Sequence, residues 1–409
     1  MIHLLLNIYI VYTICNYIPR AIILIANYKL TKKGCLNNNI HHNSYLYNAS
    51  NRNIVKPSPD LLYSYVFIDF TKINYIIFQL STCNVYRSLT LYDNDTNVIH
   101  VFNHSKLSNN IPSNNYNIMI VSPNYNIQNN DPNMIIVKSP TNICLGIQRI
   151  LCSNKNNINA LIDIQHQFII NEINHKKNLS LLENINYYLI LNIISVVIIT
   201  SLLIYFDYLD YLYVFMYIFF DCLVYYMNQQ IVDIFPSLFN TKTNGPWKFN
   251  TMIGCKDCNS FMKLYIALTS ILALTKEEAI YMIANTDSYG NTLKSNEDYI
   301  IYFSEILPAK WWSITAYGKD NYLIPNTDNI YSYNNENIDI KNNNSFIIHL
   351  SSVNNGYKNW LPSGNSEKAL LFHLNPFWGI TNPQLVLRLY NPDLSKLHDI
   401  QYLPKIFKI

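Results

Sequence analysis

Three stretches of the chain are apolar over lengths that suit a membrane helix. Residues 187–206 contain no charged side chain, and twenty residues in helical form match the thickness of a bilayer core. Residues 211–227 are also mainly apolar, although Asp221 would cost about 3 kcal/mol at mid-membrane. The pattern predicts a membrane anchor over 1–28 and transmembrane segments over 187–227, arranged as a hairpin.

Alternatives stay open for two of these stretches. Residues 1–28 could be a cleaved signal peptide, but no small-x-small site follows the apolar core, which favours an uncleaved anchor. Residues 211–227 are rich in tyrosine and could instead lie in the membrane interface. Lys29, Lys32 and Lys33 follow the first segment, and the positive-inside rule therefore predicts that the first soluble part is cytoplasmic.

The rest of the chain has the pattern of short strands separated by Asn, Asp, Ser and Pro turns. We expect two β-sandwich domains, over 57–180 and 240–409, the second with a helical lead-in. The expected strands are 63–70, 75–80, 88–92, 299–303, 312–317, 345–350 and 385–390.

Helices are expected at three places. The apolar spacing predicts one near 159–171 and one over 261–274. The capping box from Thr275 to Glu278 predicts a third, which would run through Asn285. The expected fold class is therefore mainly β: two jelly-roll-like β-sandwich domains with a few helices, plus transmembrane helices.

A short sequence occurs once in each half of the chain. Residues 88–92 read Ser-Leu-Thr-Leu-Tyr, and residues 313–317 read Ser-Ile-Thr-Ala-Tyr. Because side chains alternate along a strand, Ser, Thr and Tyr share one face in both segments and the aliphatic residues share the other. The echo indicates two related β-sandwich modules.

Composition narrows the range of partners. Charged residues make up 13% of the chain, about half the usual share, and hydrophobic residues 50%, which favours a membrane-associated protein. The net charge is +3 and no dense basic run is present, so nucleic acid is not an expected partner. The abundance of Asn, Ile and Tyr resembles translation of an AT-rich genome, and chance glycosylation motifs therefore carry little weight.

The common catalytic and cofactor motifs are missing. The nine glycines form no Gly-x-Gly, so the loops that hold nucleotide phosphates are not expected. The sequence contains neither a Gly-x-Ser-x-Gly elbow nor a His-Glu-x-x-His motif. Of the eight cysteines, only Cys255 and Cys258 have redox or metal spacing, and no second ligand pair accompanies them. No cofactor and no metal is expected, with a redox or metal role for this pair as the alternative.

All five tryptophans fall in the second half. Trp311 and Trp312 are adjacent in a predicted strand and so face opposite ways: one enters the core, and the other could stack a sugar or another flat ligand. Arg388 could clamp an anion or pair with a carboxylate. Asp69 and Asp93 could act as acid and base, or could be a buried hydrogen-bonded carboxylate and a turn carboxylate. The candidate ligand-binding residues are Trp311, Trp312, Tyr317, Asn326, Trp360, Arg388, Asp69 and Asp93.

Ordered motifs resemble a pair of bacterial families, the domain of unknown function 1254 followed by the domain of unknown function 1214. The first is similar over Pro59–Ser64, Asp69 and Tyr86–Asp93. The second is similar over Gly245–Trp247, Glu278–Tyr281, Pro308–Tyr317, Leu323–Asn326, Asn359–Pro362 and Leu387–Pro392. The chain looks like a fusion of short, separately membrane-anchored versions.

The resemblance implies jelly-roll-like sandwiches and brings no established reaction. Ile330 stands where the second family usually has Arg, and 366–379 looks like an insertion. We therefore expect an integral membrane protein that binds a ligand or serves a structural, envelope-associated role, with the lipid bilayer and a small-molecule or carbohydrate ligand as partners. The alternative is a hydrolase of a small or carbohydrate-like substrate, in which Asp69, Asp93 or Glu305 would converge with a histidine.

Overall fold

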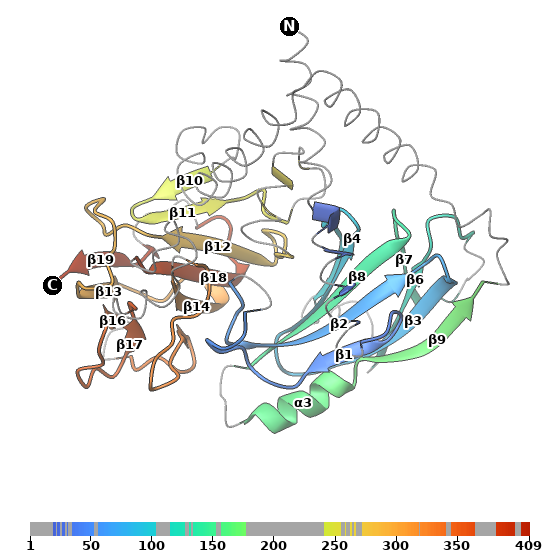
Figure 1. The fold of residues 1–409 in the computed structure, drawn as a ribbon, viewed down its shortest axis with the longest axis horizontal. Helices are drawn as coiled ribbons and strands as arrows, with labels where there is room; N and C mark the ends of the chain where they lie inside the picture. The colour runs from blue at the N-terminus through green and yellow to red at the C-terminus, as the bar shows by residue number, and fades with distance from the viewer. Residues whose placement is uncertain are drawn as a thin grey trace, which may run out of the picture.

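The computed structural model describes two bodies of strands, which we call the N-terminal half and the C-terminal half (Figure 1). The described residues are 35–52, 56–103, 115–126, 131, 134–152, 157–176, 241–254, 272–318, 320–340, 345–364, 382–396 and 402–409, with scattered positions in 19–31 and 258–266.

The N-terminal half is a two-sheet sandwich. One sheet has the order β1-β2-β8-β4-β5 and the other β7-β6-β3-β9. All neighbours are antiparallel except β6 and β7. The strands are β1 (Ile40–Asn43), β2 (Leu61–Asp69), β3 (Ile73–Ser81), β4 (Arg87–Asp93), β5 (Val98–Asn103), β6 (Asn115–Val121), β7 (Met134–Lys138), β8 (Ile143–Leu151) and β9 (Ile169–His175).

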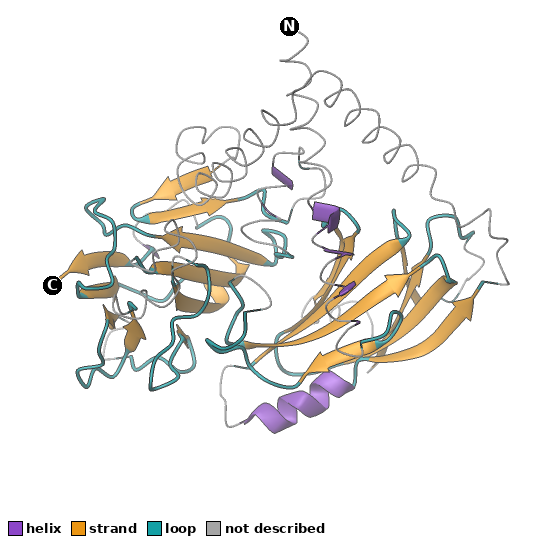
Figure 2. Ribbon diagram, in the orientation of Figure 1, coloured by secondary structure: helices purple, strands orange, loops and turns teal. Residues whose placement is uncertain are grey.

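Alternation along these strands separates a core face from an outer face. Leu89 and Leu91 of β4 pack in the core with Phe78 and Ile118 of the opposite sheet. Helix α3 (Ile158–His166) runs beside the sandwich (Figure 2). Its first turns have the predicted apolar spacing, and the helix ends before β9.

The C-terminal half is a second sandwich, with sheets β10-β11-β12-β18-β14-β15 and β17-β16-β13-β19. Only β16 and β17 are parallel. The strands are β10 (Thr241–Asn244), β11 (Trp247–Asn250), β12 (Ala279–Ala284), β13 (Tyr299–Phe303), β14 (Ala309–Tyr317), β15 (Ser332–Asn334), β16 (Phe346–Ser351), β17 (Trp360–Pro362), β18 (Gln384–Pro392) and β19 (Lys405–Lys408).

The two halves repeat one strand arrangement. In the first, β8 lies between β2 and β4, with β5 outside; in the second, β18 lies between β12 and β14, with β15 outside. The register also repeats, so that each sheet carries a row of Tyr, Arg, Ser and Asn on its outer face. The rows are Tyr63–Arg149–Ser88–Asn103 and Tyr281–Arg388–Ser313–Asn334.

Every strand predicted from sequence is present, with boundaries that shift by a few residues. The helix predicted from the capping box is wrong: Glu278 closes a turn on the carbonyl of Thr275, and 279–284 form β12. Sheet pairing with β11 and β18 on both sides overrides the helical signal. The predicted helix over 261–274 lies mostly outside the described residues.

No helix within the described part of the chain is long and apolar enough to cross a membrane. The predicted fold class is therefore corrected: the β-sandwiches are present, and the transmembrane helices are not supported. Residues 187–227 lie outside the described residues, as does most of 1–28. Where the latter is described, Ile23 is buried against Phe67 and Tyr92. An apolar side chain that packs on protein has the same hydropathy as one that faces lipid, which is why the pattern misled.

Candidate functional site

The outer faces of the two large sheets meet in one interface, which we call the seam. Leu61 and Leu151 of the N-terminal half pack in one buried cluster with Ala279, Trp311 and Tyr390 of the C-terminal half. Residues that would line a solvent-exposed sheet face in an isolated sandwich are therefore covered by the other half.

Arg388, which is 3% exposed, is the centre of a set of hydrogen bonds across the seam. We call such a set a latch. The Arg388 guanidinium donates to Thr315 Oγ1 at 3.0 Å, to the Tyr317 hydroxyl at 2.6 Å and to the carbonyl of Lys56 at 3.0 Å. The Tyr317 hydroxyl donates in turn to the carbonyl of Pro57 at 2.6 Å. Arginine, threonine and tyrosine of the C-terminal half thus hold the segment that leads into β2.

The second latch is centred on Arg149 of the N-terminal half and binds a segment of the C-terminal half through the same residue types. Arg149 donates to Thr90 Oγ1 at 3.2 Å, to the Tyr92 hydroxyl at 3.1 Å and to the carbonyl of Leu272 at 2.5 Å. The Tyr92 hydroxyl donates to the carbonyls of Leu272 and Ala273 at 2.7 and 3.2 Å. Each half therefore holds the lead-in segment of the other, as in an isologous dimer.

The two residues whose carbonyls accept from the arginines both have a strained backbone conformation. Lys56 has φ of 48° and Leu272 has φ of 60°. Non-glycine residues seldom adopt this left-handed region, and such strain persists where the surrounding structure fixes it. Since the carbonyls of both residues accept from a buried arginine, the latches provide that constraint.

Carboxylates cross the seam at matching positions, just before β2 and β12. Asp60 accepts from Ser332 Oγ at 2.7 Å and from the amide of Asn334 at 3.3 Å. Glu278 accepts from the amide of Asn103. Both carboxylates are therefore bonded to neutral groups of the opposite half.

Four buried polar groups at the seam can donate hydrogen bonds: the Tyr86 and Ser88 hydroxyls, the Ser313 hydroxyl and the Trp311 indole Nε1. The Tyr86 and Ser88 hydroxyls interact with each other, whereas the Ser313 hydroxyl and the Trp311 indole have no partner among the described residues. Tyr86 and Ser88 are two residues apart on the outer face of β4 and its approach, and Trp311 and Ser313 have the matching places on β14. We call these four groups the seam donors.

Two buried arginines and a lysine bring positive charge to the seam. Within the described residues, neither Arg149 nor Arg388 lies within ion-pair distance of a carboxylate. Burial, and then the neighbouring charge of Arg388, lowers the pKa of Lys56 to about 8. Burial also raises the pKa of Tyr63, which keeps this phenol neutral at physiological pH.

Three other candidate residues have structural roles: Trp312, Trp360 and Asn326. Trp312 stacks on Phe303 and Phe346 in the core. Trp360 is buried and donates from its indole to Ser351 Oγ at 3.0 Å. The amide of Asn326 holds its own loop, through bonds to the backbone of Ile324 and Ile330.

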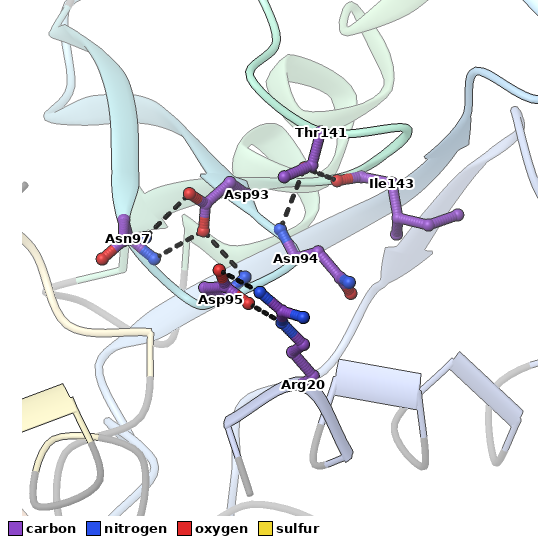
Figure 3. Close-up of polar contacts among 7 residues, drawn as sticks. All are labelled: Arg20, Asp93, Asn94, Asp95, Asn97, Thr141 and Ile143. Carbon is purple, nitrogen blue, oxygen red and sulfur yellow. Dashed lines mark hydrogen bonds and ion pairs between the residues drawn. The ribbon is translucent and has the colours of Figure 1, made fainter. Parts of the chain in front are cut away.

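Asp93 holds the turn between β4 and β5, as Figure 3 shows. Its carboxylate accepts from the backbone of Asp95 and Asn97 at 2.8 and 2.9 Å and from the Asn97 amide at 2.8 Å. In the same view Arg20 pairs with Asp95, with one N–O distance of 3.0 Å.

Asp69 serves its own turn in the same way, because it accepts from Thr71 N at 3.0 Å and Thr71 Oγ1 at 2.5 Å. Among the described residues, neither Asp69 nor Asp93 bonds to a histidine or to the other carboxylate. In the structure both carboxylates hold turns.

Of the candidate residues, the structure thus brings Trp311, Tyr317 and Arg388 together at the seam. Sequence reasoning did not single out Arg149 or Tyr86 as functional. The repeated Ser-x-Thr-x-Tyr sequence could have pointed to Arg149. Because Arg388 was a candidate partner of one such strand, an equivalent arginine is expected beside the other.

Near the edge of the seam a cavity of about 10 Å³ is lined by Thr96, Asn97, Gly254 and Ala273 among others, with room for about one water. Cys258 borders it and is disulfide-bonded. Among the described residues, Cys35, Cys83, Cys144 and Cys152 are not part of a disulfide.

Comparison with known families and structures agrees with this architecture. Residues 37–172 match the family described as "Protein of unknown function (DUF1254)", and residues 278–394 match "Protein of unknown function (DUF1214)". No curated protein matches the chain.

A solved structure with a TM-score above 0.5 supports the fold. The crystal structure of the VPA0106 protein from Vibrio parahaemolyticus is similar with a TM-score of 0.62 and 15% identity, over 97% of this chain and 98% of that one. A protein from Burkholderia cenocepacia is similar at a TM-score of 0.47 and 8% identity, over 96% of this chain and 87% of that one. The chain therefore consists of an N-terminal DUF1254 domain followed by a C-terminal DUF1214 domain.

Proposed function

We propose that the protein binds a polar small molecule and that its binding site is the seam. The observation that carries this proposal is the set of seam donors. A buried donor without an acceptor costs about 1–3 kcal/mol, and native proteins contain few of them. Here the Ser313 hydroxyl and the Trp311 indole lack an acceptor among the described residues, and the Tyr86 and Ser88 hydroxyls, at the matching positions of the other half, interact with each other.

The surroundings of the seam donors support the same function. Small-molecule sites are found preferentially between domains and combine aromatic walls with a few polar groups. Tyr390 contacts Tyr86 of the opposite half on one side and Trp311 on another, with ring centroids 5.4 and 5.0 Å apart. A ligand that reached these rings would meet donors from both halves.

The test is a thermal-shift screen on the full chain, with neutral sugars, dicarboxylates and phosphate as separate probe classes, each titrated. A ligand of the seam stabilises the folded state saturably. In the double substitution Ser88→Ala/Ser313→Ala, the change at position 313 should raise the stability of the free protein by about 1 kcal/mol, because it removes a desolvated hydroxyl. The double substitution should also reduce the ligand-dependent shift.

Two results would count against the proposal. One is that no probe class stabilises the protein saturably. The other is that a stabilising ligand acts equally on the double variant, because its site then lies elsewhere. A matched variant, Ser304→Ala, lies outside the seam strands and should leave the ligand shift unchanged.

A further inference from the structure

The chemistry of the seam donors restricts the class of ligand that can bind there. An indole N–H can only donate, and so can a guanidinium. Tyr86 is held neutral because burial raises the pKa of its hydroxyl, which is then available as a donor. The ligand must therefore supply acceptors.

The charge at the seam points the same way. The hydrogen-bond partners of Arg149 and Arg388 are hydroxyl and carbonyl oxygens, all of them neutral. The nearby carboxylates Asp60 and Glu278 accept hydrogen bonds from amide and hydroxyl groups of the opposite half. A buried cation without a counter-ion is costly, since desolvation removes several kcal/mol that hydration would supply.

The repeated register places each arginine next to a seam donor. Ser88 lies directly across from Arg149, and Ser313 lies directly across from Arg388. Each half therefore has a cradle that combines a guanidinium, a serine hydroxyl and one aromatic donor. The N-terminal cradle is Arg149, Ser88 and Tyr86, and the C-terminal cradle is Arg388, Ser313 and Trp311.

We infer that the ligand is an oxyanion, carrying carboxylate or phosphate groups, and that the two cradles are quasi-equivalent subsites for it. This inference rests on the proposed binding function and deepens it. Charge-assisted hydrogen bonds from arginine and serine to the oxyanion would supply a counter-charge that no described carboxylate supplies at ion-pair distance. Oxygens of the ligand would at the same time satisfy the indole and the hydroxyls.

The experiment titrates the full chain with malonate, with inorganic phosphate and with glucose, and reads the melting temperature. Sodium chloride at matched ionic strength is the control for screening, and the saturable part of each curve separates binding from the general salt effect, which rises without saturation. Malonate or phosphate should saturate while glucose and chloride do not. The arm that saturates identifies the source of the oxyanion.

Variants locate the binding. Ser313→Ala removes one donor of the C-terminal cradle and leaves the Arg388 latch in place, so the protein should fold and the apparent affinity should fall about tenfold. Ser88→Ala should have a similar effect through the other cradle. An affinity that neither substitution changes would overturn the assignment to the cradles.

The outcomes separate the inference from the function on which it rests. Saturable stabilisation by glucose alone would overturn the oxyanion and leave a polar-ligand site at the seam. Stabilisation by none of the probes, together with none from the wider screen, would overturn both.

Discussion

Arg149 and Arg388 each present several donors to three acceptors, two on their own sheet and one on the opposite half. A lysine would keep the charge but lose the planar fork that reaches hydroxyl and carbonyl together. At the scale of single residues, this geometry is the most exacting feature of the seam.

The first prediction concerns Arg388→Lys. The substitution should lower the free energy of unfolding by about 2–3 kcal/mol, because hydrogen bonds of a buried charged donor are lost. Chemical denaturation of the full chain measures it. The control is Arg52→Lys, whose exposed pair with Asp320 should contribute less than about 1 kcal/mol. Equal costs for the two substitutions would mean that the latch contributes no more than a surface ion pair.

The second prediction concerns pH. Burial, followed by repulsion from His166 and His41, lowers the pKa of His42 to about 4. Below the unfolded value of 6.5 the unfolded chain binds a proton that the folded chain refuses, so stability falls as the pH drops from 6.5 to 4. His42→Gln should flatten this part of the stability profile, whereas His41→Gln on the same strand is the comparison. A slope unchanged by His42→Gln would refute the assignment.

Single tryptophans show where residue-level reasoning succeeds and where it stops. Alternation predicts that Trp311 and Trp312 face opposite ways, and they do: Trp312 lies in the core and Trp311 at the seam. The sequence could not show that the outer face is covered, because that depends on the other half of the chain. The sequence could not show the structural roles of Trp360 and Asn326 either, because their hydrogen-bond partners are set only by the folded register.

At the scale of elements, strands were predictable and one helix was not. Strands such as β13 and β18 have strong β-type composition and clear turns on both sides. The 279–284 segment has a valid capping signal before it, but pairing on both edges decides its structure. Local sequence carries no information about those two neighbours.

The matching elements also compensate in volume. Gly146 of β8 lies between Val66 and Leu91, whereas the equivalent Leu385 of β18 lies between Ala284 and Ala316. The large and small residues have exchanged places, which keeps the total volume similar. The core therefore preserves the arrangement of strands while the residues differ.

The third prediction follows from this packing. A methyl group at Gly146 would lie 2.7 Å from Val66 Cγ1, so Gly146→Ala should cost about 1–3 kcal/mol. Adding Val66→Ala removes the clashing atom, and the double variant should be more stable than the sum of the two single costs implies. Equilibrium denaturation of the four proteins gives the coupling. Strict additivity would show that the glycine is not required by the packing.

At the scale of the molecule, reciprocity is the main feature: two related sandwiches hold each other through equivalent contacts. The Ser-x-Thr-x-Tyr echo indicated the relationship from sequence. Hydropathy alone does not decide at this scale, because it cannot separate apolar residues that pack on protein, such as Ile23, from those that face lipid. The predicted membrane location stays a prediction.

The fourth prediction tests whether the seam holds the halves together without the covalent link. A protease site introduced between residues 181 and 240 would be cut after the full chain has folded. Under reducing conditions, which remove the disulfide of Cys258, the halves should co-elute in gel filtration at micromolar concentration, since the seam combines a buried apolar cluster with two latches. The same cut in an Arg149→Lys/Arg388→Lys protein should release more of each half. Complete separation of the unsubstituted halves would contradict a strong seam.

A crystal structure of the full chain grown in malonate would examine the seam itself. We predict density for the dicarboxylate at a cradle, with carboxylate oxygens within hydrogen-bond distance of Ser313 Oγ and Trp311 Nε1 and close to Arg388. If these donors were instead bonded to acceptors of the protein and the seam held no added molecule, the binding site proposed here would be wrong.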